Sequence, residues 1–326
     1  MNILVTGSAG RVGRRLVGEL LAAEHAVTSV DLRDPGVTRP SLTHHSGSIA
    51  DPEFVERVVN NVDAVVHLSA LMSWKDEDAE RMFEANVNGT ERLLESVSRR
   101  PLRRFVLASS GEVYPENNPV KLPIDEDHRT APTSFYGFTK HLAEESVRFF
   151  MRRDKLKGVI LRFSHTQDAP ELFDPESWFS GPRFFLSRKL QTARERGQHE
   201  VAEALARYDD GEEKLVISRG RDGTPFRMHI TETADIVQGV VRALEREEAV
   251  GETFNIGSDD PISFDEVVPR MSEYLGIPTA DIRLPVDAPN YRTSNQKAKR
   301  LLGFQPRWDF ARMMKEGAEF RHTRGE

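Results

Sequence analysis

The first half of the chain alternates short apolar runs with segments of helical periodicity, and this pattern constrains the fold more than any other feature. The apolar runs predict strands at 2–6, 26–31, 42–46, 63–68, 103–109 and 157–163. Amphipathic helices are predicted between them at 11–23, 51–60, 79–99 and 135–153. Such a repeated strand–helix unit forms a parallel sheet that helices cover on both faces.

The second half follows a different pattern. From about residue 165 the alternation stops, and 183–208 predicts one long helix or a pair that is broken at Gly197. We expect the sheet to be completed by apolar segments at 214–218, 226–230 and 253–256 and by a helix at 231–246. Short helices are predicted at 264–275, 295–302 and 309–322. Because 326 residues exceed what one core usually fills, we predict two domains. The larger consists of 1–165 plus about 226–258, and the smaller, mostly helical one of about 166–225 plus 259–326.

Composition excludes several classes of function. The net charge of -7 gives no electrostatic reason to expect a nucleic-acid partner. The absence of cysteine excludes disulfides, thiolate catalysis and cysteine-ligated zinc, and no metal site is predicted. No apolar run approaches the roughly 18 residues of a membrane helix, so we expect no membrane partner and a cytoplasmic location.

A glycine-rich turn follows the first predicted strand. The segment Thr6–Gly13 places Gly7, Gly10 and Gly13 at a spacing of three, directly before a helical pattern. Gly7 permits a tight turn, Gly10 lets the backbone approach a pyrophosphate, and Gly13 lets helix and strand pack closely. The sequence therefore predicts a Rossmann-type, doubly wound α/β fold, and Arg11 and Val12 of this turn are candidate dinucleotide contacts.

An acidic residue ends the second predicted strand, about twenty residues further on. The carboxylate of Asp31 would accept hydrogen bonds from the adenosine ribose and repel a 2′-phosphate, which favours NAD over NADP. Arg33 and Arg11 leave the alternative open, because a guanidinium near the ribose could hold a 2′-phosphate.

The candidate catalytic pair is Tyr136 and Lys140, which share one face of a predicted helix, one turn apart. An ammonium and a nicotinamide cation near the phenol would lower the pKa of Tyr136 and make it a usable acid or base. Ser110 follows an apolar strand and therefore lies at the carboxyl edge of the sheet, where α/β active sites form.

Along the chain the glycine turn comes first, Ser110 second and the Tyr136–Lys140 pair third. These three motifs in this order resemble the extended short-chain dehydrogenase/reductase family of sugar-nucleotide epimerases and dehydratases. The resemblance implies that Tyr136 is the acid/base, that Lys140 tunes it and binds the nicotinamide ribose, and that Ser110 assists. It also implies a homodimer through helices 79–99 and 135–153. Further implied cofactor contacts are Ser48, Ile49, Leu68, Ser69, Ala70, Asn86 and Phe163. His67 is interpreted as a structural residue at a strand end.

The substrate side departs from the family pattern. His165 stands where the family usually has an asparagine that contacts the diphosphate, and the arginine expected before the His229 strand is displaced to Arg227. Arg221, Arg227 and Arg292 are candidates for an anionic group of the substrate, since guanidinium pairs well with carboxylate or phosphate.

Glu112 is the remaining candidate, as one half of the acidic pair that dehydratases of the family use. Burial in a cleft would raise its pKa enough for acid catalysis, and a role in binding a substrate hydroxyl is equally compatible with the sequence. We predict a small sugar-like substrate and epimerisation of a sugar nucleotide. The alternatives are a dehydrogenase of a non-nucleotide sugar or sugar acid and, more remotely, a non-catalytic NAD sensor.

Overall fold

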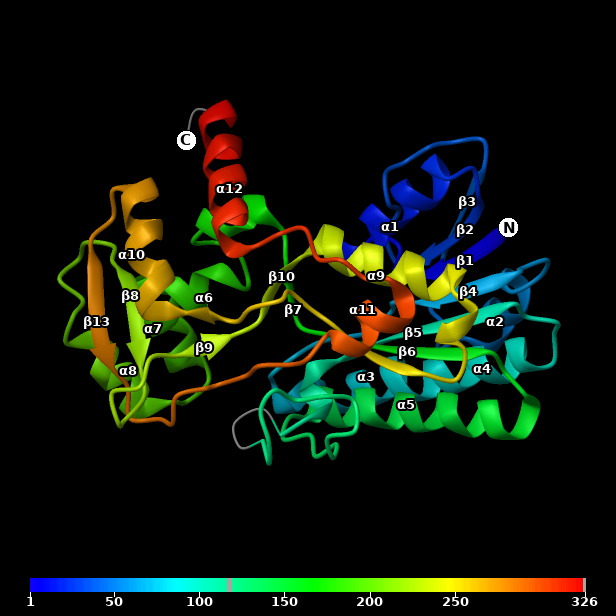
Figure 1. Cartoon of the computed structure of the whole chain (residues 1–326), viewed down its shortest axis with the longest axis horizontal. Helices are drawn as coiled ribbons and strands as arrows, with labels where there is room; N and C mark the ends of the chain where they lie inside the picture. The colour runs from blue at the N-terminus through cyan, green and yellow to red at the C-terminus, as the bar shows by residue number, and fades with distance from the viewer. Residues whose placement is uncertain (116–118, 325–326) are drawn as a thin grey trace.

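The centre of the protein is a seven-stranded parallel sheet with the strand order β11-β6-β5-β4-β1-β2-β3 (Figure 1). The structure is a computed structural model that describes residues 1–115 and 119–324. Its sheet strands are β1 (Asn2–Thr6), β2 (Ala26–Asp31), β3 (Leu42–Ser46), β4 (Ala64–His67), β5 (Arg104–Ser110), β6 (Gly158–Phe163) and β11 (Thr253–Ile256). The predicted doubly wound fold is confirmed, and the strand order reverses between β1 and β4, where α/β proteins form their ligand crevice.

Helices cover both faces of this sheet, as Figure 1 shows with α9 on one side and α5 on the other. One buried cluster joins the sheet to apolar residues of α1, α9 and α11, and a second joins its other face to α2, α4 and α5. These helices are α1 (Arg11–Ala22), α2 (Pro52–Val58), α4 (Gly89–Ser98), α5 (Phe135–Asp154), α9 (Thr233–Glu245) and α11 (Gln296–Leu302). Strands buried on both faces explain the continuous apolar runs in the sequence.

The helix predicted at 79–99 is interrupted. It consists of α3 (Ala79–Phe83), one π-helical turn at Glu84–Asn88 and then α4. A π-turn widens the helix by one residue per turn and is frequent at functional sites. Here it contains Asn86, whose side chain is buried and only 1% exposed.

A smaller second part is built from the later segments, with two buried clusters of its own. It contains α6 (Ser180–Phe184), α7 (Leu186–Glu195), α8 (His199–Ala206), β8 (Leu215–Arg219), α10 (Phe264–Leu275), β13 (Thr279–Arg283) and α12 (Phe310–Arg324). The helix pair broken at Gly197 is confirmed, because that glycine has a left-handed φ of 64° between α7 and α8. These clusters are separate from the two that cover the large sheet, and the division into two domains stays a prediction.

The segments at 214–218 and 226–230 were wrongly assigned to the large sheet, and strand β13 was not predicted. The segment at 214–218 forms β8, but β8 pairs in parallel with β13 in the second part instead of completing the large sheet. The alternating burial of Ala280 and Ile282 in β13 was visible in the sequence as a period of two. Only β11 joins the large sheet from the segments expected to complete it.

Two short strand pairs form where the chain passes between the parts. Strand β7 (His165–Gln167) pairs in parallel with β10 (Ile230–Glu232), and β9 (Arg227–Met228) pairs antiparallel with β12 (Ile262–Ser263). The predicted strand at 226–230 therefore belongs to these crossings.

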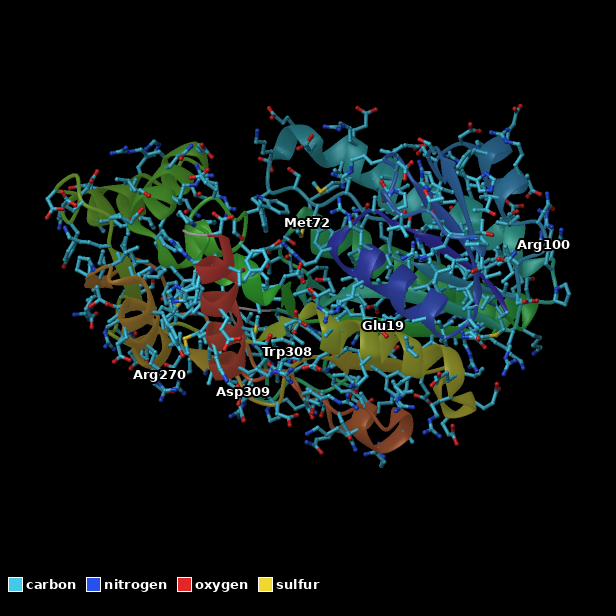
Figure 2. The ribbon with its side chains drawn as sticks, turned by 90° about the horizontal axis from the view of Figure 1, so that it is seen from above. Glu19, Met72, Arg100, Arg270, Trp308 and Asp309 are labelled. Carbon is cyan, nitrogen blue, oxygen red and sulfur yellow. The ribbon has the colours of Figure 1, made fainter. Side chains whose placement is uncertain are left out.

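A further crossing leads to α12. Figure 2 shows Trp308 at the junction of the two parts and Met72 on the side of the larger part that faces the smaller one. The backbone N–H groups of Arg307 and Trp308 both donate to the carboxylate of Asp235 in α9, at 2.9 Å. In the described ranges, no helix is long and apolar enough to span a bilayer.

Candidate active site

The glycine turn lies at the carboxyl end of β1, as predicted. Gly7 has a φ of 72°, which favours glycine, and its N–H donates to the carbonyl of Val30 at 2.8 Å. A Cβ at this position would lie 2.7 Å from the backbone nitrogen of Ser69. The turn is therefore held between the ends of β2 and β4, and no larger residue fits.

The first turn of α1 opens onto a cavity. Arg11 and Val12 line this cavity, and no side chain of the described residues caps the helix at Gly10. The first N–H groups of an α-helix lack intrahelical acceptors and carry the positive end of the helix dipole. The arrangement fits a dinucleotide pyrophosphate, which would supply the missing acceptors.

Asp31 and Arg33 lie beside this turn at the end of β2. The carboxylate of Asp31 accepts the N–H of Ala9 at 3.0 Å and that of Arg33 at 3.1 Å, while the Arg33 side chain lines the cavity. Asp31 retains acceptor capacity for ribose hydroxyls, since each carboxylate oxygen can accept a further hydrogen bond. Ser48 and Ile49 line no part of the cavity: Ser48 accepts the N–H of Ala50, and Ile49 is buried against α4.

The loop after β4 packs against the glycine turn. Its Ser69 N–H donates to the Thr6 hydroxyl at 3.3 Å, and the preceding Leu68 and the following Ala70 flank this contact. Asn86 holds the same loop, because its amide exchanges hydrogen bonds of 2.7 and 2.8 Å with the backbone of Leu71. Asn86 therefore fixes the backbone of the loop that packs against the glycine turn.

His67, at the end of β4, matches its structural interpretation. It is fully buried, and its two ring nitrogens contact the hydroxyls of Thr6 at 2.7 Å and Thr90 at 2.9 Å. Burial, and then the charge of Lys140, lower the pKa of His67 to about 3. The ring is neutral at physiological pH and is occupied by structural hydrogen bonds.

Tyr136 and Lys140 lie in the first turns of α5. Ser134 caps this helix by accepting the N–H of Gly137 at 2.9 Å, and its own hydroxyl donates to Glu112 at 2.6 Å. Tyr136 lines the cavity, whereas Lys140 is 2% exposed behind it. The predicted pair is thus brought together, with the phenol facing the ligand space.

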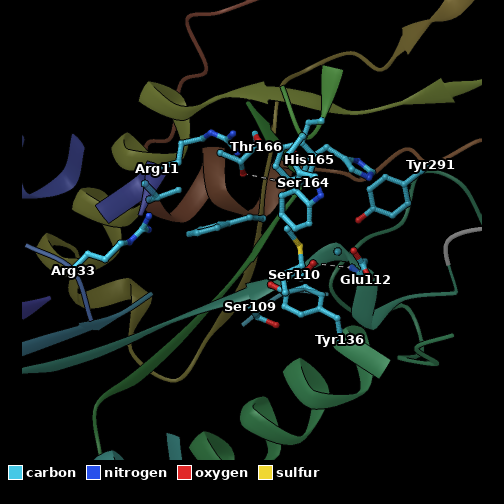
Figure 3. Close-up of a pocket in the computed structure, with 16 residues that line it drawn as sticks. Arg11, Arg33, Ser109, Ser110, Glu112, Tyr136, Ser164, His165, Thr166 and Tyr291 are labelled. Atoms are coloured by element: carbon cyan, nitrogen blue, oxygen red, sulfur yellow. Dashed lines mark hydrogen bonds between the residues drawn. The ribbon is translucent and has the colours of Figure 1, made fainter. Parts of the chain in front are cut away.

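Three catalytic candidates share one side of the cavity, which has a volume of about 460 Å³. Ser110 ends β5 and accepts the N–H of Glu112 at 3.1 Å. Figure 3 shows Ser110, Glu112 and Tyr136 pointing into the same space, with Arg11 and Arg33 further along it. The structure therefore unites the predicted catalytic groups with the glycine turn.

Burial dominates the electrostatics of this side. Burial, followed by the negative charge of Glu112, raises the pKa of Tyr136, and the lowering predicted from the sequence depends on a nicotinamide cation beside the phenol. Burial lowers the pKa of Lys140 to about 8, against the opposing charge of Glu144. Burial also raises the pKa of Glu112, opposed by its bond to Ser134, as predicted for a carboxyl group in a cleft.

The opposite wall is formed where the chain passes between the two parts. His165 lines the cavity, its Nδ1 contacts the backbone carbonyl of His229 at 3.2 Å, and its ring meets Tyr291 edge to face at 5.8 Å. Burial, and then the charge of Arg183, lower the pKa of His165 to about 3. A carbonyl only accepts hydrogen bonds, so Nδ1 carries the proton and Nε2 is left as an acceptor. Phe163 also lines this cavity, as the resemblance implied.

The three arginines that were candidates for substrate binding lie outside this cavity. Arg227 and Arg292 are exposed, and Arg221 forms an ion pair of 2.9 Å with Asp287. Arg227 lies in β9, and Arg221 and Arg292 lie in loops whose path the sequence pattern did not predict. Arg11 lies in the cavity instead, in ion pairs with Glu171 and Asp168.

Several lining residues were missed by sequence reasoning. They are Met72, Ser109, Ser164, Thr166, Trp178, Phe179 and Tyr291. Ser164 and Thr166 could have been found, because they directly follow a predicted strand at the carboxyl edge. Trp178, Phe179 and Tyr291 come from irregular segments, for which periodicity carries no signal.

Comparisons with a family model, with other sequences and with solved structures agree with the family resemblance found in the sequence. The model of the NAD dependent epimerase/dehydratase family matches residues 3–176. A crystal structure of a short-chain dehydrogenase/reductase superfamily protein from Agrobacterium tumefaciens with bound NAD is 46% identical, with a TM-score of 0.95 over 99% of this chain and 98% of that chain. UDP-glucose 4-epimerase of Halalkalibacterium halodurans is 28% identical, over 98% of this chain and 94% of its own. UDP-glucose 4-epimerase of Thermotoga maritima with UDP-glucose, 24% identical, shares the fold over 100% of both chains with a TM-score of 0.79.

Proposed function

Because the chain belongs to the NAD-dependent epimerase/dehydratase family, we propose that it binds NAD and oxidises a hydroxyl group of a sugar-like substrate. The observation that carries the proposal is that Ser110, Glu112 and Tyr136 line the same cavity as Arg11 and Val12 of the glycine turn. Cofactor and reacting hydroxyl would thus meet at the carboxyl edge of the sheet, where the strand order reverses.

The cofactor would be held by the glycine turn and its neighbours. The N–H groups at the start of α1 would bind the pyrophosphate, and Asp31 would accept the adenosine ribose hydroxyls. Asp31 favours NAD over NADP, because a 2′-phosphate would lie against its carboxylate. The Agrobacterium relative, which was crystallised with NAD, supports this choice.

The catalytic step follows from the side chains around the cavity. Bound NAD supplies the hydride acceptor and a positively charged nicotinamide ring. The Tyr136 phenolate takes the proton of the substrate hydroxyl, while Ser110 donates a hydrogen bond to the same oxygen. The ammonium of Lys140 stabilises the phenolate against the burial that raises the pKa of Tyr136. Glu112 is within the same cavity and accepts a hydrogen bond from a second substrate hydroxyl.

Epimerisation of a sugar nucleotide is the reaction we propose. UDP-glucose 4-epimerases are among the relatives along nearly the whole chain, which supports this choice. The second candidate is a dehydrogenase of a non-nucleotide sugar or sugar acid. Within this candidate a neutral sugar is favoured by the exposed positions of Arg227 and Arg292, which leave the wall around His165 without these candidate anion ligands.

One experiment tests the proposal and separates the two reactions. The purified protein with NAD is offered UDP-sugars, free sugars and sugar acids, while absorbance of reduced nicotinamide and product composition are followed. A new UDP-sugar isomer without net NADH supports the epimerase, and stoichiometric NADH with a free sugar or sugar acid supports the dehydrogenase. Tyr136→Phe should bind NAD normally and lose turnover by about 10²–10⁴-fold, since only the proton transfer is removed. An active Tyr136→Phe protein would contradict the assigned role.

We also propose a homodimer through the helices at 79–98 and 135–154. Large apolar side chains are exposed on these helices, namely Phe83, Phe135, Phe138 and Phe149. A second copy of this surface would cover them. The cytoplasmic location expected from the sequence stays a prediction.

A further inference from the structure

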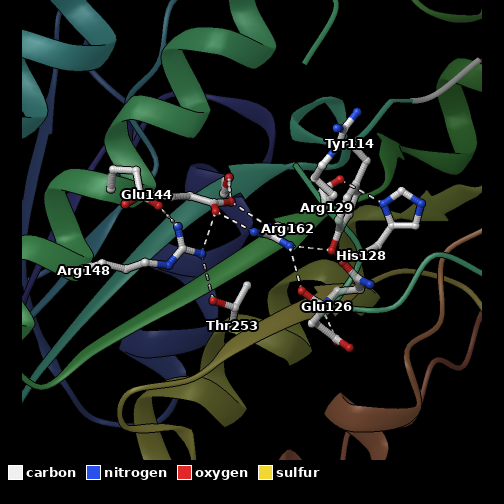
Figure 4. Close-up of polar contacts among 11 residues, drawn as sticks. Tyr114, Glu126, His128, Arg129, Glu144, Arg148, Arg162 and Thr253 are labelled. Carbon is white, nitrogen blue, oxygen red and sulfur yellow. Dashed lines mark hydrogen bonds and ion pairs between the residues drawn. The ribbon is translucent and has the colours of Figure 1, made fainter. Parts of the chain in front are cut away.

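A buried carboxylate lies one helical turn behind Lys140 in α5. Glu144 is 0% exposed and accepts four hydrogen bonds (Figure 4). The donors are the Ser109 hydroxyl at 2.6 Å, Arg162 Nε at 2.9 Å and Nη2 at 2.7 Å, and Arg148 Nη2 at 2.9 Å. Three of these four donors are nitrogens of two guanidinium groups, which form strong, charge-assisted hydrogen bonds with a carboxylate.

This carboxylate is ionised. Burial alone would raise the pKa of Glu144, but the hydrogen bonds and charge of Arg162, and then of Arg148, hold it below its ordinary value. A buried ion pair of this kind adds little net stability compared with apolar residues of the same volume. Its stronger effect is to fix geometry, because any displacement would leave a buried charge without a partner.

Two of the three partners of Glu144, Ser109 and Arg162, lie at strand ends that reach the cavity, and Ser109 itself lines it. Ser109 immediately precedes Ser110 at the end of β5, and Arg162 immediately precedes Phe163 at the end of β6. Glu144 itself shares α5 with the catalytic Tyr136. Helix α5 and strand β5, which carry Tyr136 and Ser110, are therefore linked to each other and to β6 through this one carboxylate.

The network extends to the remaining walls. Arg162 Nη1 donates to the Tyr114 hydroxyl at 2.7 Å, and that hydroxyl donates to Asn255 of β11 at 2.8 Å. Tyr114 ends the short turn that begins with Gly111 and contains Glu112. Asn255 in turn donates to the backbone of Ser294 at 3.3 Å, close to the segment that carries Tyr291.

We propose that Glu144 is a positioning residue, which sets the register of α5 against β5 and β6 so that Tyr136 and Ser110 converge on one substrate oxygen. The inference rests on the proposed function for its activity measurement, but its structural consequences can be measured without turnover. Misplacing reacting groups by about 1 Å can reduce turnover roughly a hundredfold.

Glu144 also acts on Lys140 through its charge. Burial lowers the pKa of Lys140 to about 8, and the charge of Glu144 opposes this lowering. The ring that faces Lys140 from β4 is His67, which is neutral because its pKa is about 3. Removing the charge of Glu144 therefore lowers the pKa of Lys140 further, and the ammonium is lost at a lower pH.

Glu144→Gln tests this, with Glu145→Gln as the matched control. Glu145 is the next residue of α5, is exposed, and also pairs with Arg148, at 2.7 Å. We expect Glu144→Gln to bind NAD within about twofold of wild type, to lower kcat by about 10–100-fold, and to shift the alkaline limb of the activity profile to lower pH. Glu145→Gln should match wild type in all three.

Two additions keep the test decisive. If Glu144→Gln does not fold, Ser109→Ala keeps both ion pairs and removes only the link to β5, and it should still lower kcat about tenfold. Lysine side-chain NMR of the NAD-free protein gives the pKa of Lys140, which should fall in Glu144→Gln and not in Glu145→Gln. Wild-type kcat in the folded variants, or an unchanged Lys140 titration, overturns the inference. If the wild-type protein turns over none of the substrates offered, the proposed function is refuted instead.

Discussion

Replacing glycine by alanine at two positions of α1 should have opposite effects. A Cβ at Gly13 would lie 2.1 Å from the carbonyl oxygen of Gly7 and 2.8 Å from Cα of Ser8. Ordinary van der Waals separation is about 3.5 Å, so the helix and the turn must move apart by more than about 1 Å. Gly18 is exposed on the same helix, and no atom of the described residues lies within 4 Å of a Cβ there.

The magnitudes follow from these distances. Gly13→Ala gains about 1 kcal/mol of helix propensity but loses about 1–3 kcal/mol through overpacking, so it destabilises by up to about 2 kcal/mol. Gly18→Ala has only the propensity gain and should stabilise by about 0.5–1 kcal/mol. At about 2.1 cal/mol/K per residue, unfolding a chain of 326 residues has an entropy of about 0.7 kcal/mol/K, so each kcal/mol changes Tm by about 1.5 °C. The two variants should therefore move Tm in opposite directions.

NAD titration gives the functional half of this prediction. Because Gly13→Ala displaces the N–H groups at the start of α1, its Kd for NAD should rise by about tenfold or more, equivalent to at least about 1.4 kcal/mol. Gly18→Ala should keep the wild-type Kd. If both variants bind NAD like wild type, the assignment of the pyrophosphate site to this turn is wrong. If both change Tm with the same sign, the close packing at Gly13 does not limit stability.

Three other properties can be tested directly. Stability should fall as pH drops from 6.5 towards 3, because the folded pKa values of His67 and His165 are about 3 and the unfolded chain takes up the protons; urea melts across this range should show it, and a flat profile would contradict it. Phe149→Asp should give a monomer in light scattering with unchanged NAD binding, since it charges an apolar side chain that is 45% exposed on α5; a persisting dimer would place the contact elsewhere. Ligand binding should change tryptophan fluorescence, because Trp178 lines the cavity and packs against Trp74 at a tilt of 54° with ring centroids 4.7 Å apart; the change should disappear in Trp178→Phe, and its persistence would exclude Trp178 as the reporter.

The sequence by itself determined the parallel sheet, the glycine turn and the Tyr136–Lys140 pair. These features depend on short-range geometry, because alternating apolar runs define strands and helices and four residues define one helical turn. The position of Ser110 also followed, since the carboxyl ends of parallel strands meet at one edge of a sheet.

The tertiary structure alone decided which distant residues complete the site. Tyr291 and Trp178 reach the cavity while Arg292 does not, and the sequence carries no signal for this because irregular loops lack a period. Two partners of Glu144 were hidden because Ser109 and Arg162 lie in other elements, and local periodicity does not show which strand residues contact which helix residue. Burial likewise raises the pKa of Tyr136 by an amount that the sequence does not specify, because the cost of an ionised phenol depends on how much water the folded chain removes.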